Sequence, residues 1–251
     1  MAYYIAAVNI ENAFKNASES EYYFPFNGIC LTDTFQTAED QNYFSSFFPV
    51  NSKRIKNEKE TPITVFMGNP PYSAGQKNSN DNNPNKKYPN LDSVIKQKYV
   101  ETSTAQNKNS LYDSYIRAFR YSTDELENNN GVICYVTNGG WIDGLSMDGF
   151  RKSFENEFYK IYVFNLRGNQ RTKGEESRKE GGKIFGEGSR APISITLLLK
   201  KKNYKGKAKI FYRDIGDYLN REEKLQIVKN SKSFFSLNMN LKQIFPNKYG
   251  D

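Results

Sequence analysis

A four-residue stretch, Asn69-Pro70-Pro71-Tyr72, combines residue types that could hold an amine ready for reaction. Its two consecutive prolines fix the backbone and remove two N–H donors, so the stretch offers mainly hydrogen-bond acceptors. The side-chain oxygen of Asn69 and the carbonyl oxygen of Pro70 could accept both N–H groups of an exocyclic amine and leave its lone pair open for attack. The ring of Tyr72 offers a flat face for a nucleobase, and such stacking is worth roughly 1–3 kcal/mol per base. A rigid turn after a strand is the plain structural alternative.

The chain has 251 residues and no histidine. This excludes His-based triads and His-containing metal sites, so we expect no metal centre and a chemistry carried by carboxylates, amides, Lys, Tyr and backbone groups. The two cysteines, Cys30 and Cys134, stand in apolar runs and are interpreted as buried free thiols of a cytoplasmic protein. Because no apolar run is long enough to span a bilayer, we expect no membrane partner.

Short apolar runs alternate with helical patterns along the chain. The apolar runs predict strands over 28–33, 63–68, 132–136 and 161–164, and helical spacing appears from residue 2, after Ser110, near 147–154 and near 225–228. This alternation predicts an α/β fold with a mostly parallel sheet and crossover helices. Two later strands, 193–199 and 208–212, are joined without a helix, so we expect them to form an antiparallel hairpin at one sheet edge.

Polar residues gather where the predicted strands end. Asp33, Asn69–Tyr72 and Asn138–Gly140 all fall at the carboxyl ends of strands, where open sheets of this kind bind ligands. The polar, Asn-rich loop over 73–90 directly follows one of these ends and is placed to cover a site there. The sequence therefore predicts one site at this edge of the sheet.

The balance of charges and aromatics is compatible with a nucleic-acid partner. The net charge is +8, and the chain holds 18 Phe and 18 Tyr. A basic surface attracts polyanions, and surplus aromatic rings suit base stacking. Four arginines flank the Gly-rich connection 167–190, which should open toward the predicted site. We therefore name Arg167, Arg171, Arg178 and Arg190 as candidate DNA-binding residues.

These residues resemble a known family. Asn69–Tyr72 looks like the amino-group-binding motif of S-adenosylmethionine-dependent amino methyltransferases. Wider stretches resemble adenine-specific (N6) DNA methyltransferases of restriction–modification systems, most of all single-chain enzymes of the type IIG and ISP kind that join methylase to nuclease or helicase parts. Those stretches are 2–11, 28–35, 162–169, 182–186 and 189–193. The resemblance runs from residue 2 to about residue 215 and implies a Rossmann-like methyltransferase fold.

The resemblance also implies a mechanism. The target adenine of double-stranded DNA would be flipped out of the duplex, because a stacked base cannot present its amine. Asn69 and Pro70 would hold that amine, Tyr72 would stack on the ring, and Phe185 would supply a second stacking face. The amine needs no dedicated base if its proton leaves after attack on the sulfonium.

For the cofactor, S-adenosylmethionine, the resemblance implies a contact near Asp33. This residue matches the strand-end acid that meets the cofactor's adenine ring, and Thr34 and Phe35 stand beside it. The family's Gly-rich loop and its ribose-binding acid have no counterpart in these 251 residues. We therefore expect a fold that lacks the first strands, and a catalytic fragment completed by an upstream methylase segment.

The resemblance predicts a partial catalytic domain over 1–215, followed by a linker, or the start of a target-recognition region, over 216–251. A target-recognition domain and nuclease or helicase parts would be further partners.

Two other functions remain open at this stage. The same Asn69–Tyr72 motif could serve another amine, such as that of RNA or of a protein glutamine, because a glutamine amide also carries two N–H donors. Alternatively, the chain could be a non-catalytic DNA-binding or assembly fragment, which the missing cofactor loop favours.

Overall fold

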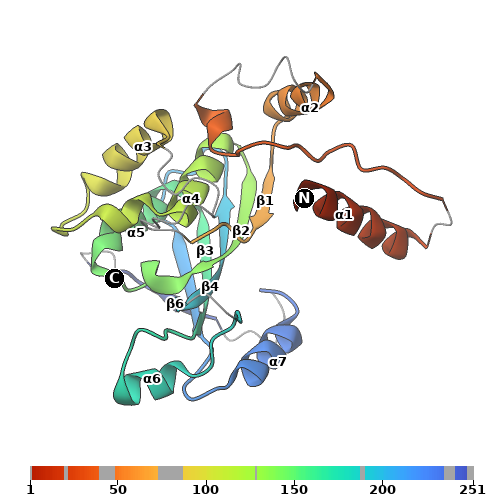
Figure 1. Ribbon diagram of the computed structural model, residues 1–251. Helices are drawn as coiled ribbons and strands as arrows, with labels where there is room; N and C mark the ends of the chain where they lie inside the picture. The colour runs from red at the N-terminus through yellow and green to blue at the C-terminus, as the bar shows by residue number, and fades with distance from the viewer. Residues whose placement is uncertain are drawn as a thin grey trace. The chain divides into compact units, whose positions relative to one another are not determined.

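The computed structural model describes residues 2–19, 22–39, 49–72, 87–127, 129–186, 190–234 and 241–247 (Figure 1). The chain divides into two compact units, Met1–Pro62 and Ile63–Asp251. Within the described ranges, no helix combines the length and the apolar character needed to cross a membrane.

The first unit contains two helices, α1 (Ala2–Ser18) and α2 (Pro49–Glu60), and a short 3-10 turn, η1 (Gln36–Ala38). The helix predicted from residue 2 is confirmed by α1, whose alanines favour helix. Polar contacts join the elements of this unit: the guanidinium of Arg54 on α2 donates to the hydroxyl of Tyr3 on α1 at 2.9 Å.

The segment 28–33 is not a strand, so that prediction is wrong. The N–H and the carbonyl oxygen of Leu31 pair with the side-chain amide of Asn51, at 2.8 and 2.9 Å. No strand occurs in the described residues of this unit, and side chains of α2 satisfy backbone groups that a neighbouring strand would otherwise take. Asp33 therefore ends no strand. Its carboxylate accepts the N–H of Phe35 at 3.1 Å and precedes η1.

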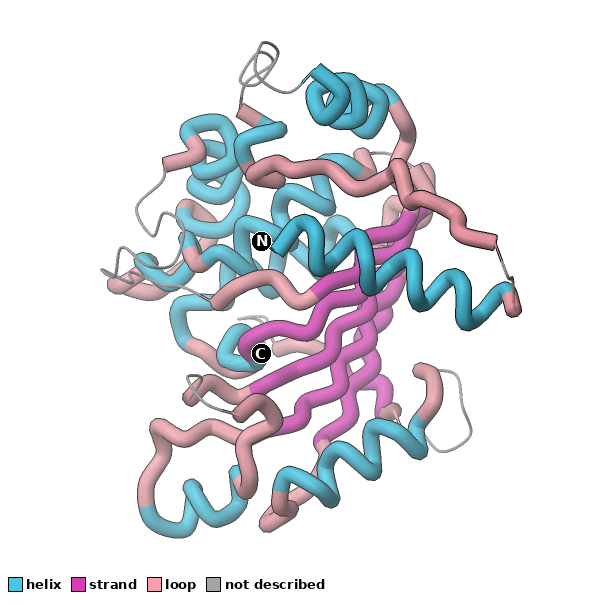
Figure 2. Tube along the Cα trace, turned by 45° about the vertical axis from the view of Figure 1, so that its right-hand side comes forward, coloured by secondary structure: helices cyan, strands magenta, loops and turns pink. Residues whose placement is uncertain are grey.

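The second unit is centred on a six-stranded sheet in the order β1-β2-β4-β3-β5-β6 (Figure 2). The strands are β1 (Val65–Gly68), β2 (Gly131–Asn138), β3 (Lys160–Arg167), β4 (Ile193–Lys200), β5 (Lys209–Asp214) and β6 (Lys242–Ile244). β1, β2, β3 and β5 run in one direction, whereas β4 and β6 run in the other. The predicted α/β fold with a mostly one-directional sheet is confirmed.

The predicted edge hairpin of 193–199 with 208–212 is wrong. β4 lies in the middle of the sheet, antiparallel to both β2 and β3, while β5 pairs in parallel with β3. Leu197 and Leu198 point to opposite faces of β4 and are both buried, which is typical of a central strand covered on both sides. The antiparallel pair at the sheet edge is instead β5 with β6.

Two helices, α4 (Ser114–Glu125) and α5 (Asp148–Glu157), cover one face of this sheet (Figure 1). α3 (Pro89–Ile95), which continues as a π-helical stretch over Lys96–Val100, packs beside them. Each fully buried phenylalanine in this layer contributes about 1.5–3 kcal/mol. The buried aromatic side chains of the layer include Tyr99, Tyr115, Phe119, Tyr121, Trp141, Phe150, Phe154 and Phe158.

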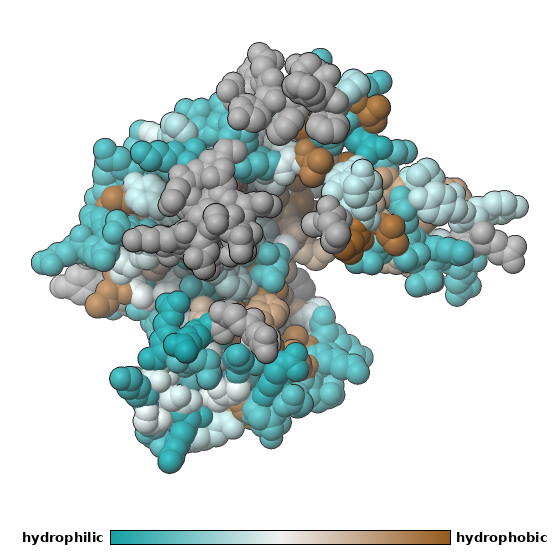
Figure 3. Space-filling view, viewed as in Figure 1, coloured by the Kyte–Doolittle hydropathy of each residue, from teal (hydrophilic) through white to brown (hydrophobic). Residues whose placement is uncertain are grey.

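The opposite face is covered near the carboxyl ends of the strands by α7 (Arg221–Ser231). Its Ile227 and Val228 pack on a buried cluster that includes Phe164 of β3. The connection after β3 contains a short helix that the sequence did not predict, α6 (Gly174–Glu180), because its glycines and charges give no apolar periodicity. Figure 3 shows a mostly hydrophilic surface over α6 and α7.

A buried arginine joins the two helices on the first face. Arg120 of α4 is only 1% exposed and donates to Glu157 of α5 at 2.8 and 2.9 Å and to Asp124 at 2.6 and 3.0 Å. Burial alone would raise the pKa of Glu157, but the hydrogen bonds and charge of Arg120 outweigh it and lower this pKa to about 2. The carboxylate is therefore charged at neutral pH and is compensated mainly by Arg120, with the ammonium of Lys98 also paired to it at 3.3 Å.

Replacing Arg120→Leu should lower the free energy of unfolding by about 3–5 kcal/mol, because it removes the buried guanidinium that donates two hydrogen bonds to Glu157 and leaves only the ammonium of Lys98, at 3.3 Å, to compensate this carboxylate. Urea denaturation followed by circular dichroism measures this change. The matched control is Arg178→Leu, which removes a solvent-exposed ion pair with Glu175 and should cost less than about 1 kcal/mol. Equal losses in the two variants would contradict a structural role for the buried network.

Candidate active site

A cleft of about 690 Å³ opens at the carboxyl ends of β1, β2 and β3. Four segments of the second unit line it: the end of the Asn69–Tyr72 motif, the start of α4, the loop after β2 and the connection after β3. The lining residues include Tyr72, Ser110, Asp113, Tyr115, Asn138, Gly140, Asp143, Ser146, Asn165, Asn169, Arg171, Glu180, Arg190 and Pro192. The predicted convergence of Asn69–Tyr72 with Asn138–Gly140 at one edge of the sheet is confirmed.

The Asn69–Tyr72 motif directly follows β1, and its tyrosine turns inward. The hydroxyl of Tyr72 donates to the side-chain oxygen of Asn69 at 2.6 Å and lies 3.3 Å from the carbonyl oxygen of Val136 on β2. The ring meets that of Tyr115 edge-on, with centroids 6.4 Å apart. These contacts fix the ring at the inner end of the cleft, while Asn69 stays exposed. Residues 73–86 of the loop predicted to cover the site lie outside the described residues.

This arrangement determines the hydrogen-bonding character of the motif. Burial raises the pKa of Tyr72 to about 12, so its hydroxyl stays protonated at neutral pH and acts as a donor to Asn69. An amide oxygen has two lone pairs, and Tyr72 uses one of them. Asn69 can therefore accept a further N–H from a ligand, and the tyrosine keeps the oxygen of the amide, rather than its nitrogen, in position for that role.

The loop after β2 forms another wall and is fixed by short-range hydrogen bonds. The side chain of Asn138 accepts the N–H of Gly140 at 2.9 Å. The N–H of Gly139 donates to the carbonyl oxygen of Pro192, just before β4, at 2.7 Å. This hydrogen bond joins the residue after β2 to the residue before β4, next to the cleft.

Two of the four candidate DNA-binding arginines are engaged inside the protein or lie outside the cleft. Arg167 ends β3 with a positive φ of 56°, and its guanidinium binds Asp214 at 2.8 Å and also Asp217. Arg178 of α6 does not line the cleft and pairs with Glu175 at 3.6 Å. Their cationic groups face carboxylates of this same chain.

The other two, Arg171 and Arg190, both line the cleft and are exposed. A backbone hydrogen bond of 3.0 Å from Gln170 to Arg190 brings the two ends of the connection together, so the two arginines stand at neighbouring positions. Among the described residues, neither guanidinium has an ion-pair or hydrogen-bond partner. The two guanidinium groups offer contacts for an anionic ligand at the edge of a cleft that the carboxylates of Asp113, Asp143 and Glu180 also line.

The connection that carries these arginines is braced by buried polar contacts. The carboxylate of Glu180 accepts the N–H of Asn169 at 2.8 Å. The ammonium of Lys224, which is fully buried on α7, donates to the carbonyl oxygens of Glu180 and Gly182 at 2.6 and 2.8 Å. Burial lowers the pKa of Lys224 to about 8. Lys224 thus stabilises the C-terminal end of α6, where carbonyl groups lack partners in the helix.

The remaining predicted site residues lie elsewhere. Phe185 follows the buried Ile184 and is 37% exposed, but it is not among the residues that line the cleft. Asp33, Thr34 and Phe35 belong to the first unit, where the Asp33 carboxylate is oriented by the N–H groups of Phe35 and Gln36. Asp33 and Phe35 are half-buried, and Thr34 is exposed.

Sequence reasoning missed two residues of the cleft at the start of α4. Tyr115 is buried and supports the ring of Tyr72, and Asp113, only 5% exposed, occupies the position before the first residue of α4. The sequence pattern predicts that Asn109 or Ser110 caps this helix, whereas a 3-10 turn, η3 (Asn109–Tyr112), comes first and α4 begins at Ser114. Aspartate is a preferred residue before a helix, so Asp113 could have been recognised as its true start.

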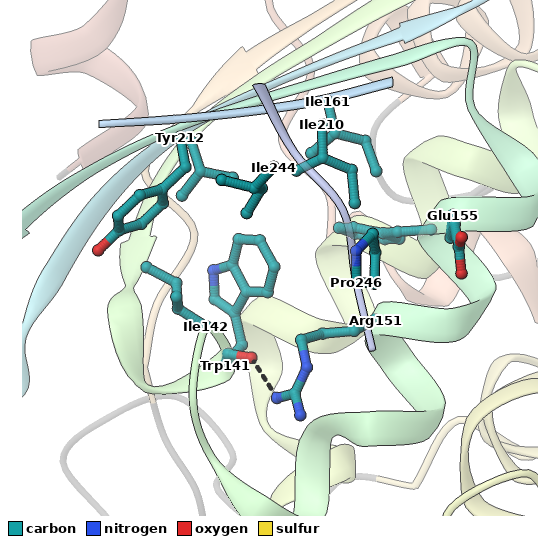
Figure 4. Close-up of a pocket in the computed structure, with 11 residues that line it drawn as sticks. Trp141, Ile142, Arg151, Glu155, Ile161, Ile210, Tyr212, Ile244 and Pro246 are labelled. Atoms are coloured by element: carbon teal, nitrogen blue, oxygen red, sulfur yellow. Dashed lines mark hydrogen bonds between the residues drawn. The ribbon is translucent and has the colours of Figure 1, made fainter. Parts of the chain in front are cut away.

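A second hollow, shown in Figure 4, has a different character. It measures about 70 Å³, about a tenth of the cleft, and lies between α5 and strands β3, β5 and β6. Its walls are mostly apolar side chains such as Trp141, Ile210 and Ile244, so we interpret it as a packing gap of the core. Across the described ranges, no group of three Cys, Asp or Glu side chains is arranged to hold a metal ion.

The comparison with known proteins identifies the family. A profile described as Eco57I restriction-modification methylase matches residues 2–171. The chain belongs to the Eco57I restriction-modification methylase family. A search among curated proteins gave no significant match.

Solved structures of larger restriction–modification enzymes have the same fold. A nuclease-deletion mutant of the Type ISP restriction-modification enzyme LlaGI, in complex with a DNA substrate mimic, is 47% identical with a TM-score of 0.91 over 99% of this chain and 20% of that one. The ATP-dependent Type ISP restriction-modification enzyme LlaBIII bound to DNA is 46% identical, with a TM-score of 0.91 over 99% of this chain and 17% of that one. A DrdV–DNA complex is 35% identical, with a TM-score of 0.87 over 99% of this chain and 23% of that one. The chain thus spans about a fifth of the length of these relatives. Its predicted resemblance to the methylase part of Type ISP enzymes is confirmed.

Proposed function

We propose that this chain is the catalytic part of a DNA methyltransferase that transfers a methyl group from S-adenosylmethionine to the N6 amine of a flipped adenine. The observation that carries the proposal is the placement of Asn69–Tyr72 at the end of β1, beside a cleft of about 690 Å³ that two exposed arginines, Arg171 and Arg190, line. Membership of a restriction-modification methylase family supports it, as do the DNA complexes of the similar enzymes named above.

The chemistry of the motif suits an aromatic amine. Adenine's exocyclic nitrogen carries two N–H groups, which Asn69 and the carbonyl oxygen of Pro70 would accept. Holding both protons in the plane of these acceptors leaves the nitrogen lone pair directed toward an electrophile. Tyr72, protonated because its pKa is about 12, would stack on the ring and keep Asn69 oriented. The target base has to leave the duplex to reach this position.

S-adenosylmethionine, when bound, supplies a methyl group activated by its sulfonium. We propose that Asp33, Thr34 and Phe35 contact this cofactor. The Asp33 carboxylate is held in one direction by two backbone N–H groups, which suits an amine donor on an adenine ring, and Phe35 offers an aromatic face beside it. Phe185, partly exposed on the connection before β4, is proposed as a second stacking surface for the target base.

We further propose that residues 216–251 lead toward a region that reads the DNA sequence, and that an upstream methylase segment and nuclease or helicase parts act with this chain. The protein would work in the cytoplasm on double-stranded DNA. The chain accounts for about a fifth of the similar Type ISP enzymes, so such partners have room in a longer polypeptide.

Replacing Asn69→Ala should reduce methyl transfer to DNA by at least about 100-fold, because the amine loses one of its two acceptors, as when one positioning hydrogen bond is removed from an active site. DNA affinity should stay within about twofold, since Asn69 makes no contact with phosphates in this account. Tritium transfer from labelled S-adenosylmethionine and fluorescence anisotropy measure the two quantities.

The matched control is Asn156→Ala, an exposed asparagine of α5 whose amide bonds only to its own helix. If Asn69→Ala abolished DNA binding as well, the amine-binding role would lose its support. Transfer to RNA or to a protein glutamine in preference to DNA would favour the alternative substrates. DNA binding without any transfer by the wild-type chain, even when it is joined to the upstream methylase segment, would favour a non-catalytic binding fragment.

Arg171→Ala and Arg190→Ala should each weaken DNA binding and lower the slope of log affinity against log salt by about 0.9, the value for one lost phosphate contact. Both guanidinium groups line the cleft without a partner among the residues that the structure describes, whereas Arg178→Ala removes a charge that faces Glu175 outside the cleft and should change the slope less. Affinity measured over a series of salt concentrations tests this. A larger effect of Arg178→Ala would place the DNA path along α6 instead.

A further inference from the structure

Leu145 is the most exposed large hydrophobic side chain in the described part of the chain, with 89% of its surface accessible to solvent. It stands in the loop 140–147 between β2 and α5. Asp143 and Ser146, on either side of it in this loop, line the cleft that holds Tyr72. An apolar side chain is therefore presented to solvent next to the candidate active site.

The loop holds Leu145 in this position because it is anchored to the core. The carbonyl oxygen of Gly144 accepts the N–H of Met147 at 3.0 Å and the guanidinium of Arg151 at 2.9 Å. Arg151 also donates to the carbonyl oxygen of Trp141 at 3.0 Å, as Figure 4 shows. The N–H of Gly144 donates to Gly140 at 3.1 Å. With Trp141 and Met147 both buried, the backbone next to Leu145 is fixed at both ends.

Leu145 lies where two hollows of the surface adjoin. Beside the cleft, Leu145 lines an open surface hollow of about 730 Å³, here called the outer hollow, which shares Ser110 and Ser146 with the cleft. The hydroxyl groups of these two serines are hydrogen-bonded at 2.7 Å and form a ridge between the hollows. A ligand that extends from the cleft over this ridge would meet the side chain of Leu145.

The surroundings of Leu145 fit a nucleic acid better than an apolar protein surface. The other residues that line the outer hollow carry small, amide or hydroxyl side chains, including Gln106, Asn107 and Asn109, and none of them carries a carboxylate. Amides and hydroxyls are common donors to phosphate and sugar oxygens. A single leucine in such a polar setting is too small a patch for a hydrophobic protein interface.

We propose that Leu145 inserts into the DNA base stack at the place that the target base leaves. This inference rests on the proposed function, since a base that turns out into the cleft leaves a gap in the duplex. Apolar side chains such as leucine are used by DNA-binding proteins as wedges between base steps. Leu145 would fill the gap and contact the unpaired base of the opposite strand.

The test uses two fluorescently labelled duplexes of identical sequence, one intact and one with an abasic analogue in place of a single adenine nucleotide. A 2-aminopurine stands opposite the gap and reports its own stacking. The abasic duplex has no base to unstack and none to occupy the cleft, so a preference for it reports on insertion alone. Wild type should bind it at least about fivefold more tightly than the intact duplex, because the gap spares part of the cost of unstacking a base step, and should change the 2-aminopurine emission.

Leu145→Ala should lose most of this preference and the emission change, while Leu145→Met, which keeps an apolar side chain of similar volume, should retain them. The matched control is Leu225→Ala, a 39% exposed leucine on α7, which should behave as wild type. If Leu145→Ala kept the full preference, or weakened binding to both duplexes equally, insertion would be disproved while the role of Asn69 would stand. If wild type bound neither duplex, the proposed function itself would fail.

Discussion

The pairing of β4 between β2 and β3 is the constraint on which the site depends. β4 runs antiparallel to both neighbours, so it starts at the edge where β2 and β3 end. The connection from β3 to β4 must therefore begin and finish at that one edge. As a result, Arg171, near its start, and Arg190, near its end, both line the cleft beside Tyr72. The direction of this one central strand thus places the two arginines at the same edge of the sheet as the Asn69–Tyr72 motif.

Two buried cations stabilise this arrangement, one in the helical layer and one in the connection between β3 and β4. Arg120 joins α4 to α5 through Glu157 and so stabilises the helical layer behind Tyr115 and Tyr72. Lys224 holds the connection itself by binding two of its carbonyl oxygens. In both cases a charge has been removed from water, which is costly unless several hydrogen bonds compensate it. The cleft is therefore bordered by segments with fixed geometry, as the positioning of a reacting amine requires.

Much of the second unit could be predicted from the sequence because its signals are local. Continuous apolar runs mark β1 and β2, the polar residues after them mark the edge with the site, and periodic apolar residues mark α4 and α5. The resemblance of Asn69–Tyr72 and the wider stretches to a methylase family was sufficient to identify it, and the comparisons agree.

What escaped prediction depends on partners that are distant along the chain. The apolar run over 28–33 has the composition of a strand, yet Asn51, twenty residues later, takes its backbone groups. The ion pairs of Arg167 with Asp214 and Asp217, about fifty residues later, could not be predicted from the residues around it. The central place of β4 depends on which strands are available to pair with it, and the inward turn of Tyr72 depends on Tyr115. No local pattern encodes such pairings.

The central claim is that the cleft beside Asn69–Tyr72 presents the amine of adenine for methylation. It is tested most directly by incubating the chain, joined to its proposed upstream methylase segment, with duplex DNA and S-adenosylmethionine that carries a deuterated methyl group, and then analysing the digested nucleosides by mass spectrometry. The account predicts label on N6 of adenine, lost with Asn69→Ala. Label on a cytosine carbon, or DNA that is bound but never labelled, would contradict it.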